Sequence, residues 1–250
     1  MTDHSQMRLG KCDARHDART LVLASYLSSA LPPAPAACGY SHYVPSWPMY
    51  GNDQIGDCTI AGVGHMIQCW TAAGKHSEIT IAEADVIKAY EAIGGYDPAD
   101  PTTDDGAVEL DVLRYWRTHG IGGHKIGAYM SVAPASTALI TDAIYLFGGI
   151  YIGLELPVSA QTQTVWDVPP GGLRGAGKPG SWGGHCVIVT DYDSRGLTCV
   201  TWGATKRLTW AFLRAYCSEA YAILSQDFLI AGMAPNGFEI AALQRDLVML

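Results

Sequence analysis

Two short runs, one ending at Cys58 and one ending at His185, constrain this chain more than any other feature. Gly56-Asp57-Cys58 predicts a tight turn that leads into a helix. Glycine and aspartate favour turns, and apolar residues recur at helical spacing over residues 59–73. Gly183-Gly184-His185 precedes an apolar run over residues 186–192, which indicates a buried strand.

The chemistry of these two residue types indicates nucleophilic catalysis. A helix N-terminus and a neighbouring imidazolium both favour the thiolate, which is the nucleophilic form of cysteine. We therefore expect Cys58 to be a nucleophile that faces His185. His185 would act first as a general base toward the thiol and then as a general acid toward the leaving group.

The composition excludes several classes of partner. With 250 residues, 48% of them hydrophobic and 16% charged, the chain predicts one large globular domain or two lobes that share a site. The net charge of -8 argues against a nucleic-acid partner. The longest apolar stretch, residues 138–156, is interrupted by polar residues and glycines, so we expect no membrane partner. Oligomeric state is not indicated.

The cysteines and the N-terminus predict a compartment. The first residues lack a basic region followed by an apolar core, so no secretory signal is visible. The seven cysteines are odd in number and show no paired metal-ligand spacing. These features favour reduced thiols in the cytoplasm and no metal site.

The periodicity of apolar residues changes along the chain. Residues 1–20 are polar and are expected to be loosely held. We expect a capping box at residues 80–83 and a loop over residues 166–184. Helical spacing dominates the first half and alternation the second, which predicts an α+β fold. The expected helices cover residues 20–31, 59–73, 80–92, 109–119 and 209–217, and the expected strands cover 149–156, 186–192, 197–202 and 220–224.

In this order the motifs resemble those of the papain-like cysteine peptidases. The nucleophile turn at Cys58 opens the first long helix, and the run Gly184-His185-Cys186-Val187 is similar to the histidine strand of that family. Further similar segments are Asp104-Asp105-Gly106, Gly148-Gly149-Ile150 and Val200-Thr201-Trp202-Gly203. The chain also resembles uncharacterised bacterial and prophage reading frames that share Gly51-Asn52-Asp53 and Gly56-Asp57-Cys58-Thr59.

The resemblance implies a two-lobed fold with a helical left lobe carrying the cysteine and an antiparallel right lobe carrying the histidine. It implies a catalytic unit over residues 45–225, with the left lobe at about 45–130 and the right lobe at about 131–225. An N-terminal extension, partly flexible, would cover residues 1–44, and a C-terminal extension residues 226–250.

The resemblance also assigns supporting residues. Asn52 stands six residues before Cys58, where the family places the side-chain amide of its oxyanion hole, and Gln54 is the alternative donor. The family's third residue, an Asn, corresponds to Val200, which cannot hold an imidazole. Thr201 could orient His185 through its hydroxyl, and Asp191 is a second possibility.

Three functions fit these expectations. The first is hydrolysis of a peptide or related amide bond through an acyl-thioester on Cys58, acting on a peptide or protein substrate without a cofactor. The second uses the same pair for acyl transfer or deamidation. The third is a catalytically silent module that binds a partner. Because only 57 residues precede Cys58, we expect no long inhibitory pro-segment and expect control by substrate access or expression.

Overall fold

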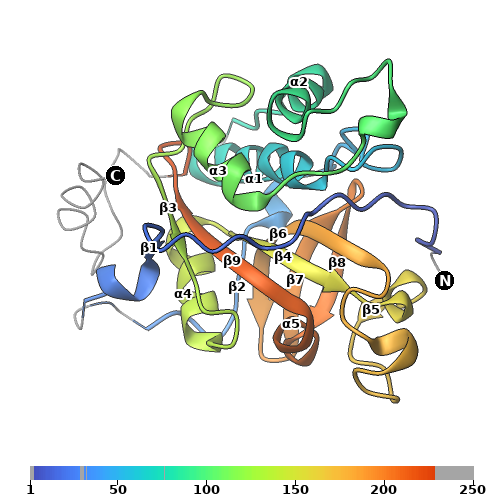
Figure 1. The fold of residues 1–250 in the computed structure, drawn as a ribbon. Coiled ribbons are helices and arrows are strands. Elements are labelled where there is room, and N and C mark those ends of the chain that lie inside the picture. Colours follow the sequence, from blue (N-terminus) through green and yellow to red (C-terminus); the bar gives the residue numbers. More distant parts are fainter. Residues whose placement is uncertain (1–2, 29–30, 32, 76, 229–250) are drawn as a thin grey trace.

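Three helices form the upper lobe in Figure 1, and a β-sheet with two further helices forms the lower one. The computed structural model describes residues 3–28, 31, 33–75 and 77–228. The upper lobe contains α1 (Cys58–Lys75), α2 (Glu83–Gly94) and α3 (Glu109–Thr118). Helix α1 packs against the sheet on one side and against α2 and α3 on the other, so its apolar positions are buried all round.

The lower lobe is built on a nine-stranded sheet. Eight strands follow the order β1-β3-β9-β4-β6-β7-β8-β5, and the ninth, β2, pairs with β6. Neighbouring strands are antiparallel except in the pairs β1–β3 and β5–β8. The strands are β1 (Leu21–Val22), β2 (Cys38–Gly39), β3 (Ala128–Ser131), β4 (Ile150–Leu156), β5 (Val165–Trp166), β6 (Gly183–Asp193), β7 (Gly196–Thr201), β8 (Ala204–Thr209) and β9 (Cys217–Leu224).

The two faces of the sheet bury two separate cores. Alternate residues of a strand point to opposite faces, so Val187 and Val189 of β6 face one core while Cys186 and Ile188 face the other. The first core is completed by α4 (Thr137–Phe147) and α5 (Trp210–Tyr216), and the second by α1, α2 and α3. The second core therefore joins the lobes and fixes the start of α1 against β6.

The helices expected at 59–73, 80–92, 109–119 and 209–217 correspond to α1, α2, α3 and α5, and the four expected strands to β4, β6, β7 and β9. The helix expected over residues 20–31 is wrong, because this segment forms β1 and a 3-10 turn at Leu23–Tyr26. The capping box at residues 80–83 is also wrong: α2 begins after Ala82 without a side-chain cap. Helix α4 and strands β2, β3, β5 and β8 were not expected.

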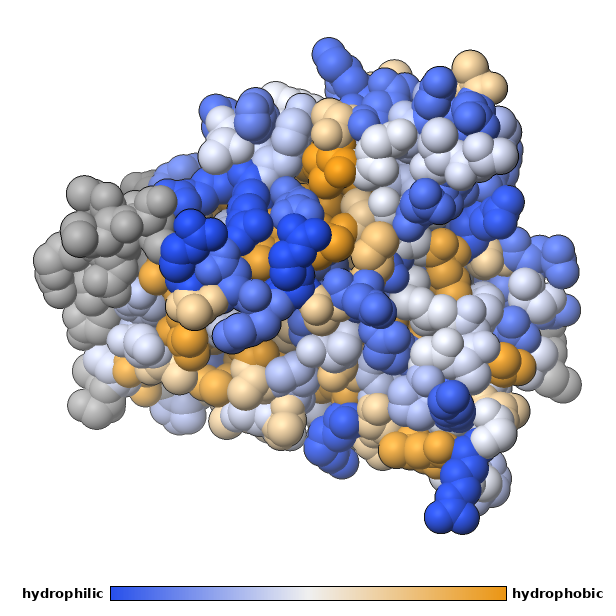
Figure 2. All heavy atoms as spheres, in the orientation of Figure 1, coloured by the Kyte–Doolittle hydropathy of each residue, from blue (hydrophilic) through white to orange (hydrophobic). Residues whose placement is uncertain are grey.

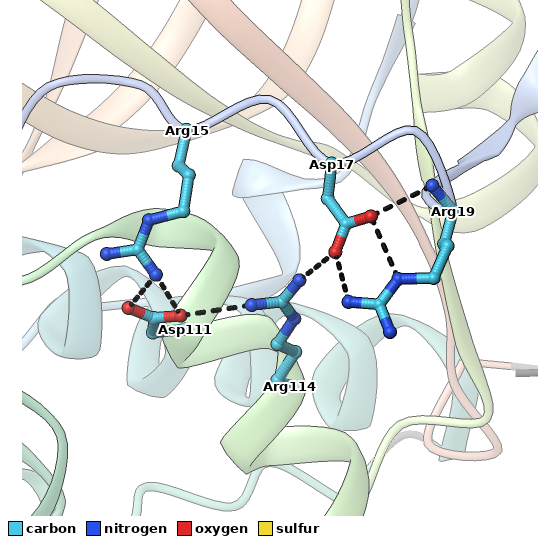
Figure 3. A network of polar contacts seen from close by, with 5 residues as sticks. All are labelled: Arg15, Asp17, Arg19, Asp111 and Arg114. Atoms are coloured by element: carbon cyan, nitrogen blue, oxygen red, sulfur yellow. Dashed lines mark hydrogen bonds and ion pairs between the residues drawn. The ribbon is translucent and has the colours of Figure 1, made fainter.

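The N-terminal chain crosses the junction of the two lobes before it joins the sheet. Figure 1 shows it running between the helices above and the strands below, toward β1. Ion pairs attach it to α3, because Arg15 lies 2.8 Å from Asp111 and Asp17 pairs with Arg114 and Arg19 (Figure 3). Figure 2 shows strongly hydrophilic residues gathered on this face around that crossing.

The segment expected to be loosely held is therefore bonded to both lobes over much of its length. Within the part of the chain that the structure describes, no helix is long and apolar enough to cross a membrane. The division into residues 1–44, 45–225 and 226–250 stays a prediction, and the last 22 residues, 229–250, lie outside the described residues.

Candidate active site

Cys58 is the first residue of α1, and its side chain points to the junction of the lobes. Its Sγ accepts a hydrogen bond from the backbone N–H of Cys186 at 3.4 Å, so the thiol lies beside the residue that follows His185. The turn before it is pinned to the upper lobe, since the N–H of Gly56 donates to Asp104 at 2.8 Å. The two sequence runs, one in each lobe, thus meet.

His185 lies at the start of β6 with one ring nitrogen bonded and the other without a partner. Its Nε2 is 2.7 Å from Oγ1 of Thr201, the last residue of β7. The indole of Trp202 stacks on the imidazole with ring centroids 4.5 Å apart. Nδ1 is buried and has no hydrogen-bond partner among the described residues. The ring is held by one hydrogen bond and one stacking contact, and its second nitrogen is unbonded among the described residues.

The Cys58 thiol and the His185 imidazole are not hydrogen-bonded to each other in this arrangement. Burial raises the pKa of Cys58 to about 12, although the N–H groups of Cys186 and Gly10 oppose this. Burial also lowers the pKa of His185 to about 3. Both side chains are only 1% exposed and therefore stand as a neutral thiol and a neutral imidazole, not as a thiolate and an imidazolium.

The two candidate oxyanion donors lie differently. Asn52 is buried, and its Nδ2 donates to the carbonyl oxygen of Ile55 at 3.2 Å, within the turn that precedes α1. Gln54 is exposed and lines a surface hollow with residues of α2, such as Glu83. Asn52 is thus the amide on the buried side of the turn. Asp191, the alternative partner for His185, is bonded instead to Ser41 at 2.9 Å and to Thr190.

Asp57 is a buried carboxylate that sequence reasoning did not single out. It is fully buried next to Cys58, and neither of its side-chain oxygens has a hydrogen-bond partner among the described residues. Burial raises its pKa well above the ordinary value, and the nearby Asn52 amide opposes that rise. A neutral Asp57 adds no negative charge beside the thiol. The Gly-Asp-Cys run was interpreted only as a turn, so the burial of this residue carried no signal in the sequence.

The N-terminal chain covers the Cys58–His185 pair. The N–H of Lys11 donates to the carbonyl of Gly184 at 3.1 Å, and the N–H of Ala107 donates to the carbonyl of Gly10 at 2.8 Å. Cys12 N–H donates to Ala107 in turn, at 3.0 Å. An extended piece of polypeptide is therefore hydrogen-bonded to both lobes directly over the thiol.

Glycines allow this close approach of one backbone to another. A Cβ at Gly184 would lie 2.2 Å from the carbonyl oxygen of Lys11, and a Cβ at Gly10 would lie 1.7 Å from that of Gly56. On the far side of the pair, Trp202 donates its indole N–H to the carbonyl of Arg8 at 3.2 Å. Its ring also stacks on His4, with centroids 5.1 Å apart. Nothing in the polar composition of the first residues indicates this placement.

All seven cysteines are free, and no group of three metal-ligating side chains is found among the described residues. The junction of the lobes brings together a thiol, an imidazole bonded to a hydroxyl, a buried amide and backbone groups that pair with an extended peptide.

Several known structures have a similar fold. Xylellain, a cysteine protease from Xylella fastidiosa, superposes with a TM-score of 0.65 at 15% identity, covering 90% of this chain and 98% of xylellain. The digestive procathepsin L 3 of Tenebrio molitor larval midgut gives a TM-score of 0.60 at 12% identity, covering 88% and 77%. The chain has the papain-like fold. The Carica candamarcensis cysteine protease CMS1MS2 gives 0.55 at 14% identity, covering 76% and 99%.

The papain-like fold confirms the expected fold class, with Cys58 at a helix N-terminus in the helical lobe and His185 in the antiparallel lobe. No protein-family model and no curated protein matches the sequence. At these low identities the structural likeness concerns the fold, so the roles of individual residues rest on the geometry described above.

Proposed function

We propose that the chain is a thiol hydrolase that cleaves peptide or related amide bonds through an acyl-thioester on Cys58. The papain-like fold supports a cysteine protease at this general level. The observation that carries the proposal is the extended segment over the thiol. Its backbone pairs with Gly184 next to His185 and with Ala107 before α3, so the junction binds a peptide main chain.

The bonding of His185 supports its role as the base. If Nε2–H donates to Thr201, the lone pair of Nδ1 is left to take the thiol proton. The Cys58 sulfur then attacks the carbonyl carbon, and the oxyanion is stabilised by the Cys58 backbone N–H and the Asn52 amide. The imidazolium returns its proton to the departing amine. Water next attacks the thioester, His185 takes a proton from it, and the acid leaves as the thiol re-forms.

The neutral pair of the covered arrangement is consistent with this reaction once the segment has moved. Burial is the first cause of both pKa shifts, so admitting water would lower the pKa of Cys58 and raise that of His185. The two values would then approach each other, and proton transfer from thiol to imidazole would become less costly. Removal of the segment is therefore part of the proposed activation.

A peptide library followed by mass spectrometry tests the hydrolase. We expect wild type, and more strongly Lys11→Ala, to cut a subset of peptides, and Cys58→Ala to cut none. Cys38→Ala is the matched control because Cys38 is a partly exposed thiol on β2. Peptides left intact by both active proteins, with no acyl adduct on Cys58, would overturn the proposal. Incorporation of an added amine in place of water would identify acyl transfer instead.

A further inference from the structure

The side chain of Lys11 fills an acidic pocket beside the Cys58–His185 pair. Its Nζ lies 3.0 Å from Glu155 of β4 and 3.2 Å from Glu219 of β9, and the Lys11 side chain has no solvent exposure. Nζ also donates to the carbonyl of Cys12 at 3.0 Å. A lysine is rarely buried this completely without carboxylate partners, so the pocket is built for a cation.

A third carboxylate, Glu109, closes the pocket from the upper lobe. Glu109 is the first residue of α3, is fully buried, and has no hydrogen bond to either side-chain oxygen among the described residues. Burial would lower the pKa of Lys11, but the carboxylates of Glu109, Glu219 and Glu155 outweigh it and raise that pKa above its ordinary value. Lys11 is therefore charged in a site with more acidic than basic groups.

The floor of the pocket admits a long side chain only because residue 153 is glycine. A Cβ at Gly153 would lie 2.2 Å from Cε of Lys11 and 2.8 Å from the carboxylate of Glu109. The passage is thus shaped along the aliphatic part of the lysine, with charge at its end. An unbranched side chain with a terminal cation fits both features.

The position of the pocket relates it to the proposed reaction. Lys11 directly follows Gly10, whose backbone packs against Gly56 two residues before Cys58, and its own N–H pairs with Gly184 next to His185. A side chain in this pocket therefore belongs to a residue within about two positions of the bond that the thiol would attack, since one extended residue spans about 3.3 Å.

We propose that the pocket of Glu109, Glu155 and Glu219 selects peptide substrates with a lysine or arginine next to the cleaved bond, and that Lys11 is its internal occupant. The inference rests on the proposed hydrolase function and names its substrate class. When Lys11 withdraws, the three carboxylates lose their only cation among the described residues, and a basic side chain of the substrate restores it. Substrate and N-terminal segment compete for one pocket.

Hydrolysis and binding of matched peptides test the pocket separately from catalysis. Capped hexapeptides carry lysine, norleucine or glutamate at each position in turn. With the Lys11→Ala full chain we expect the best lysine peptide to have a kcat/KM about tenfold or more above its norleucine counterpart, because the unpaired carboxylates disfavour an apolar side chain. The wild type should show the same preference at lower rates.

Variants of the pocket carry the decisive comparison. Adding Glu155→Gln and Glu219→Gln to Lys11→Ala should reduce the lysine preference to within about threefold, because lysine peptides lose their charged partners and norleucine peptides no longer meet unpaired carboxylates. Glu91→Gln, an exposed residue of α2, is the control and should leave the preference intact. Gly153→Ala should exclude lysine and arginine because the added methyl group fills the passage. This steric effect does not depend on charge.

Binding to the inactive Cys58→Ala/Lys11→Ala chain, followed by fluorescence anisotropy, separates the two proposals. Tighter binding of lysine peptides, without cleavage by any protein that retains Cys58, would support the pocket proposal and overturn the hydrolase proposal. Cleavage that depends on Cys58 but is equal for lysine, norleucine and glutamate peptides would remove the pocket and keep the hydrolase. Absence of both cleavage and selective binding would overturn both.

Discussion

The hydroxyl of Thr201 takes the place where a side-chain amide was expected to orient the histidine. A threonine hydroxyl is shorter than an asparagine side chain, yet it reaches Nε2 at 2.7 Å because β6 and β7 pair directly and both residues lie on the same face of the sheet. Trp202 then stacks on one face of the imidazole. Position along two neighbouring strands thus compensates for side-chain length.

This geometry predicts the effect of removing the hydroxyl. Thr201→Val keeps the shape but leaves Nε2 without its partner, so we expect kcat to fall about tenfold or more, equivalent to about 1.4 kcal/mol of activation free energy. Thr201→Ser retains the hydroxyl and should keep most of the activity. Steady-state kinetics of the two variants on one peptide makes the comparison, with thermal unfolding as a check on folding. Equal activity of the valine and serine variants would contradict an orienting role.

At the scale of elements, the N-terminal segment is anchored on the C-terminal side of its path over the site. The ion pairs among Arg15, Asp17, Asp111 and Arg114 tie it to α3, while β1 joins the edge of the sheet through β3 (Figure 3). Exposed ion pairs contribute little to global stability, about 0–1 kcal/mol each. The same energy is a larger fraction of the free energy needed to lift the segment, because this local opening costs much less than global unfolding.

Arg114→Ala should therefore loosen the cover with little effect on the fold. We expect the rate at which iodoacetamide alkylates Cys58 to rise about twofold to fivefold, the ratio expected for a loss of up to about 1 kcal/mol. Arg117→Ala, on the same helix but outside the network of Figure 3, is the matched control. Mass spectrometry of the labelled peptide measures both rates. An unchanged rate in Arg114→Ala would show that these ion pairs do not hold the segment down.

The pH dependence of the stability of the whole molecule is set by several buried ionisable groups, some of which destabilise the fold as the pH falls while others stabilise it. Burial lowers the pKa of His65 to about 4 and that of His185 to about 3. Their contributions to stability are full above an unfolded pKa of about 6.5 and are lost as the pH falls toward the folded values. Asp57 and Glu109 have raised pKa values and act in the opposite sense, so the total pH dependence is a sum of opposed terms.

A single substitution isolates one of these terms. His65→Gln retains a donor for the carbonyl of Pro48, which His65 contacts at 2.8 Å, but cannot take up a proton. Between pH 7 and 4.5 we expect wild type to lose about 2–3 kcal/mol more stability than this variant, the value of two pKa units. Denaturant unfolding of both proteins at the two pH values provides the difference. Parallel stability curves would show that His65 is not buried in its neutral form.

The spacing of apolar residues predicted the helices and strands whose formation depends on nearby residues in the sequence. Helices α1 and α3 and strands β6 and β7 have clear periods, so the sequence placed Cys58 at the start of a helix and His185 at the start of a strand. Residues 20–31 were misassigned because β1 exists only through its pairing with the distant β3, and α4 was missed within a nearly continuous apolar run. Pairings between remote segments leave no period in the sequence.

The same limit explains the candidate site. Thr201 was a candidate because it adjoins the position of the expected asparagine. The acidic pocket, in contrast, brings together Lys11 and residues 109, 155 and 219 from four separate segments of the chain. Each of those residues is an ordinary charged residue in its own segment. Only the folded chain brings the three carboxylates to one cation.

Because the cover over Cys58 is part of the same chain, its local concentration at the site is set by the attachment at β1 and does not change when the protein is diluted. An inhibitor supplied by another molecule would dissociate at low concentration, and activity per molecule would then rise. For this chain, activity per molecule should stay constant on dilution. Release would respond to the amount of competing basic peptide and to salt, so each molecule would sense its surroundings independently of its own abundance.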